Sequence, residues 1–441
     1  MSKVACIDLE TTIYENDSTG RGSPHNPDNW IVYIGIQIEG DDTISTFHIE
    51  DKAEVCIEVG RAVEFLSRNN VYMLVGQNIK FDLLYLLQQP VFKNWYMNMD
   101  IKIWDTMLAE YLLSGQLTKF ASLNFLTEKY EVGEVKDDRV KALWDSGVST
   151  EMIDEKIIVP YLKEDVIKTF SIFWHQLEQF HAQEAITEAK SFDLCLTQMV
   201  ALQATTIMEH HGMYFRAEDS LEYAHVTLIN EEKVLKEKLL EIVNHYTPSE
   251  VFDEIGDYSD ITPSLISVTL FGGNMSYVAD RPVLDEDGNL YVYKTGKNVG
   301  KIKTRKTKIT YHHDGIPFVK DKPKWIERHF TSLTKNKITK LYPTGVTVLK
   351  DLYDLLKDLY DLLDGELYTH TDYSIQACKF IENVLRWREL EKDISTYYLP
   401  YAKLTCEHDG CIHHTLNHTA TNTGRLSSSK PNLQNVTTFE E

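Results

Sequence analysis

The sequence predicts an α/β fold for its first third, because short apolar strands alternate there with a segment of helical periodicity. The first strand is the apolar run from Val4 to Ile7, which has the length and composition of a buried strand. Residues 31–38 and 44–49 follow as two strands around a Gly-Asp-Asp turn, and they indicate an antiparallel start to the sheet. A helical pattern at 55–66 and another strand at 71–75 complete the alternation.

Length and composition limit the classes of protein to which the chain can belong. Its 441 residues suffice for two or three domains with a sizeable core. A net charge of −22 argues against nucleic-acid affinity over the whole surface, so any DNA contact must come from local basic patches. The six cysteines are scattered, no signal peptide precedes the first strand, and no apolar run reaches membrane-spanning length. We therefore expect a reduced, cytoplasmic protein with no membrane partner.

Two carboxylates, Asp8 and Glu10, stand at the C-terminal end of the first strand. Residues i and i+2 of a strand point to the same side, so these side chains converge. Adjacent ionised carboxylates repel each other, and one pKa rises unless a cation holds the pair. Oxygen ligands suit hard cations such as Mg²⁺ or Mn²⁺. The alternative is that both residues merely cap the strand end, and the pair alone does not decide.

Two later patterns also carry polar side chains at helical spacing. Asn78 and Asp82 lie where a strand ends and a helix begins, and helix-start residues of these types are common without further function. Tyr161 and Asp165 follow Pro160, which favours a helix start. Their spacing of four residues places the hydroxyl and the carboxylate on one helix face. Each pattern alone is as compatible with a structural role as with chemistry.

The three patterns together resemble the motifs of the DEDD exonucleases in the subtype with tyrosine in the third motif. They occur in the family's order: Asp8-x-Glu10, Asn78-x-x-x-Asp82 and Tyr161-x-x-x-Asp165. The resemblance spans residues 1–185 and implies a ribonuclease H-like domain, in which helices flank a mixed sheet. It implies 3′→5′ exonuclease activity with two divalent ions, Mg²⁺ or Mn²⁺, bound by four carboxylates: Asp8, Glu10, Asp82 and Asp165. It also implies that Asp8 bridges the ions and that Tyr161 orients the attacking water, since tyrosine's ordinary pKa of about 10 makes it a poor base at pH 7.

Helical patterns dominate the middle of the chain, at 185–211, 221–246, 261–273 and 384–398. Two seven-residue repeats, at 350–356 and 357–363, predict one packed face made of four leucines: Leu352, Leu355, Leu359 and Leu362. Near the C-terminus, Cys406, Cys411 and His413 have a spacing that could hold zinc. The intervening Asp409-Gly410 instead favours a hairpin turn with a strand on either side.

A lysine-rich β insertion is predicted at about residues 276–325. Between residues 294 and 308 the chain holds seven lysines and arginines with no acid among them. Alternation from 301 to 308 predicts a ribbon with one cationic face, which suits a DNA backbone. The predicted DNA-binding residues here are Lys301, Lys303, Arg305 and Lys306. The alternative is a solvated hairpin without a ligand.

Residues 421–436 read Thr-Asn-Thr-Gly-Arg-Leu-Ser-Ser-Ser-Lys-Pro-Asn-Leu-Gln-Asn-Val. This stretch resembles the T-x-T-G-R-L-S-S-x-x-P-N-L-Q-N signature of family A DNA polymerases. The resemblance implies that residues 186–441 form the N-terminal part of a polymerase domain, with the start of the palm and a mainly helical thumb. In the family the arginine matching Arg425 reaches the minor groove at the primer end, where acceptors occur on every base pair. Thr423, Asn432 and Gln434 are predicted to bind DNA in the same signature.

The printed residues depart from the family in lacking its later palm motifs, with their two metal-binding aspartates, and its dNTP-binding fingers helix. We therefore predict the proofreading exonuclease and template-primer-binding portion of a phage-like family A replicase. It would be one part of a naturally split polymerase or a truncated product, active in synthesis only with a C-terminal chain carrying fingers and catalytic palm. The alternatives are a non-catalytic DNA-binding scaffold subunit and an RNA-trimming nuclease, and the signature argues against the second. The expected location is the cytoplasm of a bacterial or phage-infected cell.

Overall fold

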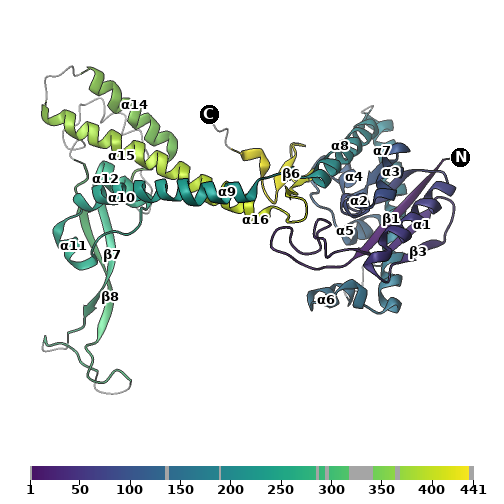
Figure 1. Cartoon of the computed structure of the whole chain (residues 1–441), viewed down its shortest axis with the longest axis horizontal. Coiled ribbons are helices and arrows are strands. Elements are labelled where there is room, and N and C mark those ends of the chain that lie inside the picture. The colour runs from purple at the N-terminus through teal and green to yellow at the C-terminus, as the bar shows by residue number, and fades with distance from the viewer. Residues whose placement is uncertain are drawn as a thin grey trace. The chain divides into compact units, whose positions relative to one another are not determined.

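The computed structural model describes residues 2–134, 139–187, 190–284, 288–293, 297–316, 341–362 and 368–436, without side chains at 358–362 and 368–374. The chain divides into two compact units (Figure 1). The first joins Met1–Ser220 to Leu399–Glu441, and the second is Leu221–Tyr398. The boundary predicted near residue 186 lies inside the first unit.

The first unit is built on a mixed five-stranded sheet, in the order β3-β2-β1-β4-β5. The strands are β1 (Lys3–Thr11), β2 (Ile31–Ile38), β3 (Ile44–His48), β4 (Val71–Gly76) and β5 (Lys102–Asp105). The central strand β1 pairs antiparallel with β2 and parallel with β4. Because β1 has neighbours on both sides, its apolar residues are almost fully buried. The predicted α/β class and the antiparallel start of the sheet are confirmed.

Helices surround this sheet and complete the first core. They are α1 (Val55–Arg68), α2 (Lys80–Leu87), α3 (Pro90–Asn98), α4 (Thr106–Leu113), α5 (Leu123–Tyr130), α6 (Arg139–Asp145), α7 (Glu155–Thr187) and α8 (Ser191–His211), with 3₁₀ turns at Lys52–Glu54 and Thr150–Met152. The long helix α7 packs over β1, β2 and β4, while α8 packs against β5. The helix predicted at 185–211 corresponds to α8, which begins six residues later, at Ser191, because α7 extends to Thr187; Gly212 caps its C-terminal end as expected.

Helix α7 begins earlier than the sequence predicts. Its first residue is Glu155, and Pro160 lies inside the helix rather than at its start. The reason is a local cap, since a carboxylate oxygen of Asp154 accepts the backbone N–H of Lys156 at 2.9 Å. Such a cap satisfies a donor that the first helical turn leaves free.

The C-terminal segment of the first unit contains little regular secondary structure. Its elements are α16 (Leu399–Leu404), β9 (Cys411–Ile412), β10 (Thr415–Asn417), β11 (Ser427–Ser429) and a 3₁₀ turn (Leu433–Asn435). β10 pairs with β11, and β9 pairs with β6 (Met213–Tyr214), which directly follows α8. The predicted hairpin with strands on both sides of Asp409-Gly410 is therefore wrong, because the helix α16 precedes the turn and the partner of β9 comes from far along the chain.

The second unit is mainly helical and has its own core. Its elements, with one helix that crosses the boundary, are α9 (Ala217–Tyr223), a π-helical turn (Ala224–Leu228), α10 (Ile229–His245), α11 (Ser249–Ile255), α12 (Pro263–Phe271), α14 (Val346–Leu362), α15 (Tyr368–Lys392) and a second π-helical turn (Asp393–Tyr398). The helix predicted at 221–246 is thus interrupted by a π-helical turn, and that predicted at 384–398 begins sixteen residues earlier. No helix within the described ranges has an apolar stretch long enough for a membrane span.

The repeated heptads lie on α14, but the buried face differs from the prediction. Leu349, Leu352 and Leu356 are almost fully buried, and Leu355 is only partly buried. The predicted and observed faces both have spacings of three and four residues and share Leu352, so the observed face is the predicted one rotated around the helix axis. The predicted positions 359 and 362 lie outside the described side chains.

The lysine-rich insertion forms an antiparallel ribbon of β7 (Gly273–Pro282) and β8 (Thr304–His313). Arg305 pairs with Arg281, and Lys306 pairs with Asp280. Since neighbouring strand residues point to opposite faces, Arg305 and Lys306 lie on different faces, and the expectation of one cationic face is corrected. Residues 317–325 of the predicted insertion lie outside the described part of the chain.

Candidate active site

The end of β1 carries the first two carboxylates of the site. Asp8 pairs in register with Gly35 and Glu10 with Tyr33, so both side chains project from the same face of the sheet. The pairing of β1 with β4 stops earlier, at Cys6. The chain after β4 is therefore free to turn toward the end of β1, where α2 begins.

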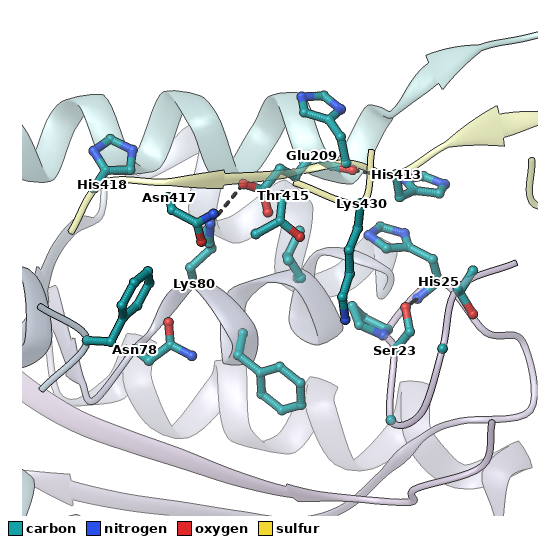
Figure 2. A pocket seen from close by; sticks show the side chains of 18 of the residues that line it. Ser23, His25, Asn78, Lys80, Glu209, His413, Thr415, Asn417, His418 and Lys430 are labelled. Carbon is teal, nitrogen blue, oxygen red and sulfur yellow. Dashed lines mark hydrogen bonds and ion pairs between the residues drawn. The ribbon is translucent and has the colours of Figure 1, made fainter. Parts of the chain in front are cut away.

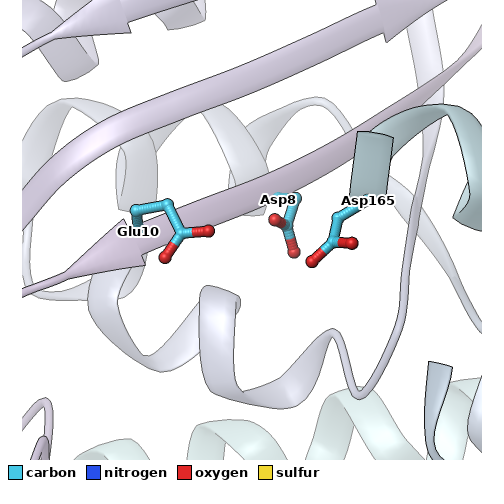
Figure 3. Close-up of side chains that lie close together, drawn as sticks. All are labelled: Asp8, Glu10 and Asp165. Carbon is cyan, nitrogen blue, oxygen red and sulfur yellow. The ribbon is translucent and has the colours of Figure 1, made fainter. Parts of the chain in front are cut away.

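Helix α7 brings a third carboxylate to the same place. One oxygen each of Asp8, Glu10 and Asp165 lies within 4.8 Å of the others, and this is the group with metal-ligand spacing found among the described residues. Figure 3 shows the carboxylates of Asp8 and Asp165 facing each other, with Glu10 farther along the strand. Cys6 helps to seat the helix, since its thiol donates to the backbone oxygen of Val166 at 3.4 Å.

The fourth predicted carboxylate, Asp82, approaches from α2 on the other side. Its Oδ1 accepts the backbone N–H of Leu9 at 3.1 Å, which ties the first turn of α2 to β1 between the two strand carboxylates. Burial raises the pKa of Asp82 well above its ordinary value, and the negative charge of Asp8 raises it further. The Cys6 thiol is affected in the same way: burial is the main cause that raises its pKa, and the charges of nearby carboxylates raise it further.

Such a concentration of buried negative charge is what a hard cation offsets. Three carboxylates from two elements, β1 and α7, lie close together, and no nitrogen or sulfur ligand belongs to the group. This donor set suits Mg²⁺ or Mn²⁺ and does not suit zinc in a structural site. The residues present therefore fit the divalent ions that the sequence predicts. Within the described residues, Cys406, Cys411 and His413 form no such group.

Tyr161 stands on α7 four residues before Asp165 and is half-buried. Its ring packs edge-to-face on Trp144, with ring centres 5.8 Å apart. The Trp144 indole donates to the Thr150 hydroxyl at 3.1 Å, and that hydroxyl donates to the backbone oxygen of Thr11 at the end of β1. The sequence analysis missed Trp144 and Thr150, because nothing in their local pattern indicates a contact with the motif tyrosine.

A cavity of about 740 Å³ opens beside the first turn of α2 (Figure 2). Asn78 lines it, exposed and with a left-handed backbone (φ 54°), which asparagine tolerates better than most residues. The exposed rings of Phe81 and Phe120 line it as well, and Lys430 reaches it from the C-terminal segment. Aromatic faces and a cation around an open cavity are features of single-strand binding sites.

None of the remaining predicted DNA-binding residues belongs to the carboxylate group. Thr423 and Arg425 are exposed in the turn before β11. Asn432 and Gln434 are exposed too, but their side chains bond to the local backbone: Asn432 caps the last 3₁₀ turn, and Gln434 donates to the oxygen of Leu426. In the second unit, the ribbon cations Lys301, Arg305 and Lys306 are exposed. Lys303 is half-buried, with its ammonium 5.0 Å from the centre of the Tyr291 ring.

Known proteins share both halves of this arrangement. A model of the 3′-5′ exonuclease family matches residues 8–179, and a model of DNA polymerase family A matches residues 334–441. The chain carries a 3′-5′ exonuclease domain and part of a family A DNA polymerase domain. The polymerase match includes the signature at 421–436, and the exonuclease match includes every motif carboxylate.

Individual relatives agree with this family A assignment. DNA polymerase I of Thermus aquaticus is 49% identical over 61 residues, which are 14% of this chain and 7% of that protein. DNA polymerase I of Deinococcus radiodurans is 40% identical over 93 residues, 20% of this chain and 10% of that protein. The matches thus span a small part of these relatives.

A solved structure shares the fold. It is the POL domain of Pol1 from M. smegmatis, in complex with a DNA primer-template and dNTP. The TM-score is 0.51 at 14% identity, and the match covers 100% of this chain and 53% of that one. At this identity the likeness concerns the fold alone.

Proposed function

We propose that this chain is a proofreading 3′→5′ DNA exonuclease and the template-primer-binding portion of a family A DNA polymerase that serves DNA replication. The observation that supports the exonuclease most directly is the convergence of Asp8, Glu10 and Asp165 from β1 and α7. Asp82 joins them through its bond to the backbone between the two strand carboxylates. Four acids gathered at one buried point destabilise the fold unless cations bind them, so a structural role alone does not account for the cluster.

In this proposal the four carboxylates hold two divalent ions, Mg²⁺ or Mn²⁺. When bound, such ions activate a water for attack on the phosphodiester and offset the charge on the departing 3′ oxygen. The chain's own residues place the reacting groups. Tyr161 and Asp165 share one face of α7, so the hydroxyl can donate to or accept from a water held beside the carboxylate. Its packing on Trp144 fixes the ring, which suits positioning of that water.

The cavity beside α2 is the proposed path of the single strand. Phe81 is adjacent to Asp82 in the chain, so a base stacked on its ring would lie next to the carboxylate site. Asn78 offers an amide at the same edge, and Lys430 offers a cation from the polymerase signature region. Two sets of residues are the proposed template-primer contacts. They are the signature residues Thr423, Arg425, Asn432 and Gln434 and the ribbon cations Lys301, Lys303, Arg305 and Lys306.

The test removes the strand carboxylates. Purified Asp8→Ala/Glu10→Ala protein should leave a 5′-labelled single-stranded DNA intact in Mg²⁺, while the wild type shortens it from the 3′ end. A matched control, Asp42→Ala/Glu54→Ala, removes two exposed acids from the same domain and should degrade the DNA at the wild-type rate. Digestion by Asp8→Ala/Glu10→Ala at the wild-type rate would refute the assignment of an exonuclease site to these carboxylates. A wild-type chain that binds primer-template without digesting it would favour the scaffold alternative.

A further inference from the structure

A largely buried ion pair links the exonuclease helix α2 to residues 415–436, the signature segment, in which β10 precedes the polymerase signature at 421–436 and pairs with β11 inside it. Lys80 and Glu209 lie 2.8 Å apart between Nζ and Oε1, with side chains 12% and 3% exposed. The ammonium also donates to the backbone oxygen of Leu416 at 2.7 Å, and the N–H of Leu416 donates to the same Glu209 oxygen at 2.6 Å. Three chain segments, from α2, α8 and β10, therefore meet in one closed network, part of which Figure 2 shows.

Lys80 lies where a shift of the backbone would move a predicted metal ligand, Asp82. It is the first residue of α2, two residues before Asp82, and the helix start has no side-chain cap at Ile79. A helix that begins without a cap frays readily in its first turn. Besides the bond from Leu9 to Asp82, the Lys80 network is a second polar anchor of this turn to other elements.

The partner side of the network belongs to the signature region. Leu416 lies on β10 and pairs with Ser428 on β11. Further bonds hold the same segment: the Tyr111 hydroxyl donates to the oxygen of Thr421 at 2.7 Å, and Thr205 bonds to His418 at 2.8 Å. The contact with Lys80 is thus part of a docked segment rather than a single stray bond.

We propose that Glu209 is a positioning residue of the exonuclease site, which fixes the first turn of α2, and with it Asp82, by holding both Lys80 and Leu416. The inference rests on the proposed exonuclease function. It makes the polymerase signature segment part of the support for a metal-binding carboxylate. Loss of the network should therefore weaken divalent-ion binding while Asp8, Glu10, Asp82 and Asp165 all remain in place.

The variants are chosen to separate positioning from stability. Replacing a buried ion pair by apolar residues of similar volume is often neutral for folding, so Lys80→Met/Glu209→Leu should keep the fold while losing the anchor. Glu209→Gln keeps an acceptor at the same position and should be intermediate. Lys93→Met is the matched control, since the Lys93 ammonium lies 3.3 Å from His210 Nε2, on the residue of α8 that follows Glu209.

The readout is Mn²⁺ binding by calorimetry, with Asp8→Ala as the reference for a disabled site and thermal unfolding as the check on folding. We expect the double apolar variant to bind Mn²⁺ about tenfold more weakly than wild type. This is the lower end of the loss in metal affinity that follows when a residue supporting a metal ligand is removed. The Mg²⁺ concentration for half-maximal DNA digestion should rise in parallel. Each single variant, Lys80→Met and Glu209→Leu, should be as weak as the double one, because both break one network.

Two results would overturn the inference: wild-type Mn²⁺ affinity in a folded double variant, or an equal loss in Lys93→Met. A wild type that binds Mn²⁺ but digests no DNA would instead count against the proposed function, and the calorimetric comparison would still judge the role of Glu209.

Discussion

A methyl group added at Gly35 should disable the exonuclease site from a distance. Gly35 lies on β2 directly opposite Asp8, and it is where α7 crosses the strand. A Cβ built there would lie 3.0 Å from side-chain carbons of both Leu162 and Val166, which are fully buried. Ordinary contact between carbon atoms is about 3.5–4.0 Å, so these side chains, and α7 with them, must give way by at least a few tenths of an ångström. Asp165 lies between these two residues on the same helix and must move with them.

Gly35→Ala should therefore slow single-strand digestion by up to about a hundredfold, since an error near 1 Å in a catalytic group has roughly that effect. Overpacking should also lower the free energy of unfolding by about 1–3 kcal/mol. Gly35 does not have a left-handed backbone, so the effect is steric. The assay is digestion of a labelled oligonucleotide in saturating Mg²⁺, with denaturant unfolding in parallel.

Gly60→Ala is the matched control. It adds the same methyl group inside α1, where the nearest atom would be 4.0 Å away. We expect wild-type digestion and a gain in stability of about 0.5–1 kcal/mol, because glycine weakens a helix interior. If Gly35→Ala digests DNA within twofold of wild type, α7 does not rest on β2 as described, and the argument for the position of Asp165 fails.

Further predictions concern chemistry, pH and DNA binding. Tyr161→Phe should slow digestion by about 10²-fold, as misplacement of a reacting group by about 1 Å does, and leave Mn²⁺ binding unchanged; loss of Mn²⁺ binding would refute a positioning role. Burial raises the pKa of Asp105 from 3.8 to about 6, so its contribution to stability, present below pH 3.8, is lost as pH rises through 6. A shift of about two pKa units, at 1.36 kcal/mol per unit, should make Asp105→Asn more stable than the wild type by about 3 kcal/mol at pH 8, as measured by denaturant unfolding. Equal stability of the two proteins at pH 8 would contradict this. The 441-residue chain alone should shorten a primer without extending it, and template-directed extension by homogeneous protein would refute our interpretation of its C-terminal part. Alanine should replace four ribbon cations together: Lys301, Lys303, Arg305 and Lys306. The slope of log affinity for primer-template against log salt concentration should then become shallower by roughly one unit per lost phosphate contact. Superimposed slopes of variant and wild type would show that the ribbon has no role in DNA binding.

The parts of the site that follow local rules were predictable from sequence. The period of two in β1 places Asp8 and Glu10 on one face, and the strand-to-helix transition places Asp82 in a first helical turn; the structure has both. The helix start before Tyr161 was placed five residues late. Proline is favoured in a first turn, but the cap at Asp154 determines where the helix actually begins.

What sequence reasoning missed are contacts between residues far apart in the chain. Lys80 and Leu416 are separated by 336 positions, and no periodicity or spacing relates them. Burial of a charge is the physical signal that such a contact leaves, because a buried ammonium needs partners for its protons. That signal appears only once a structure shows that Lys80 is buried. The signature segment was therefore assigned to the polymerase half by resemblance, although its backbone packs against the exonuclease helices. In the proposed function, a segment that resembles the polymerase by sequence and packs against the exonuclease helices would couple the two activities physically, and the Glu209 variants would measure that coupling.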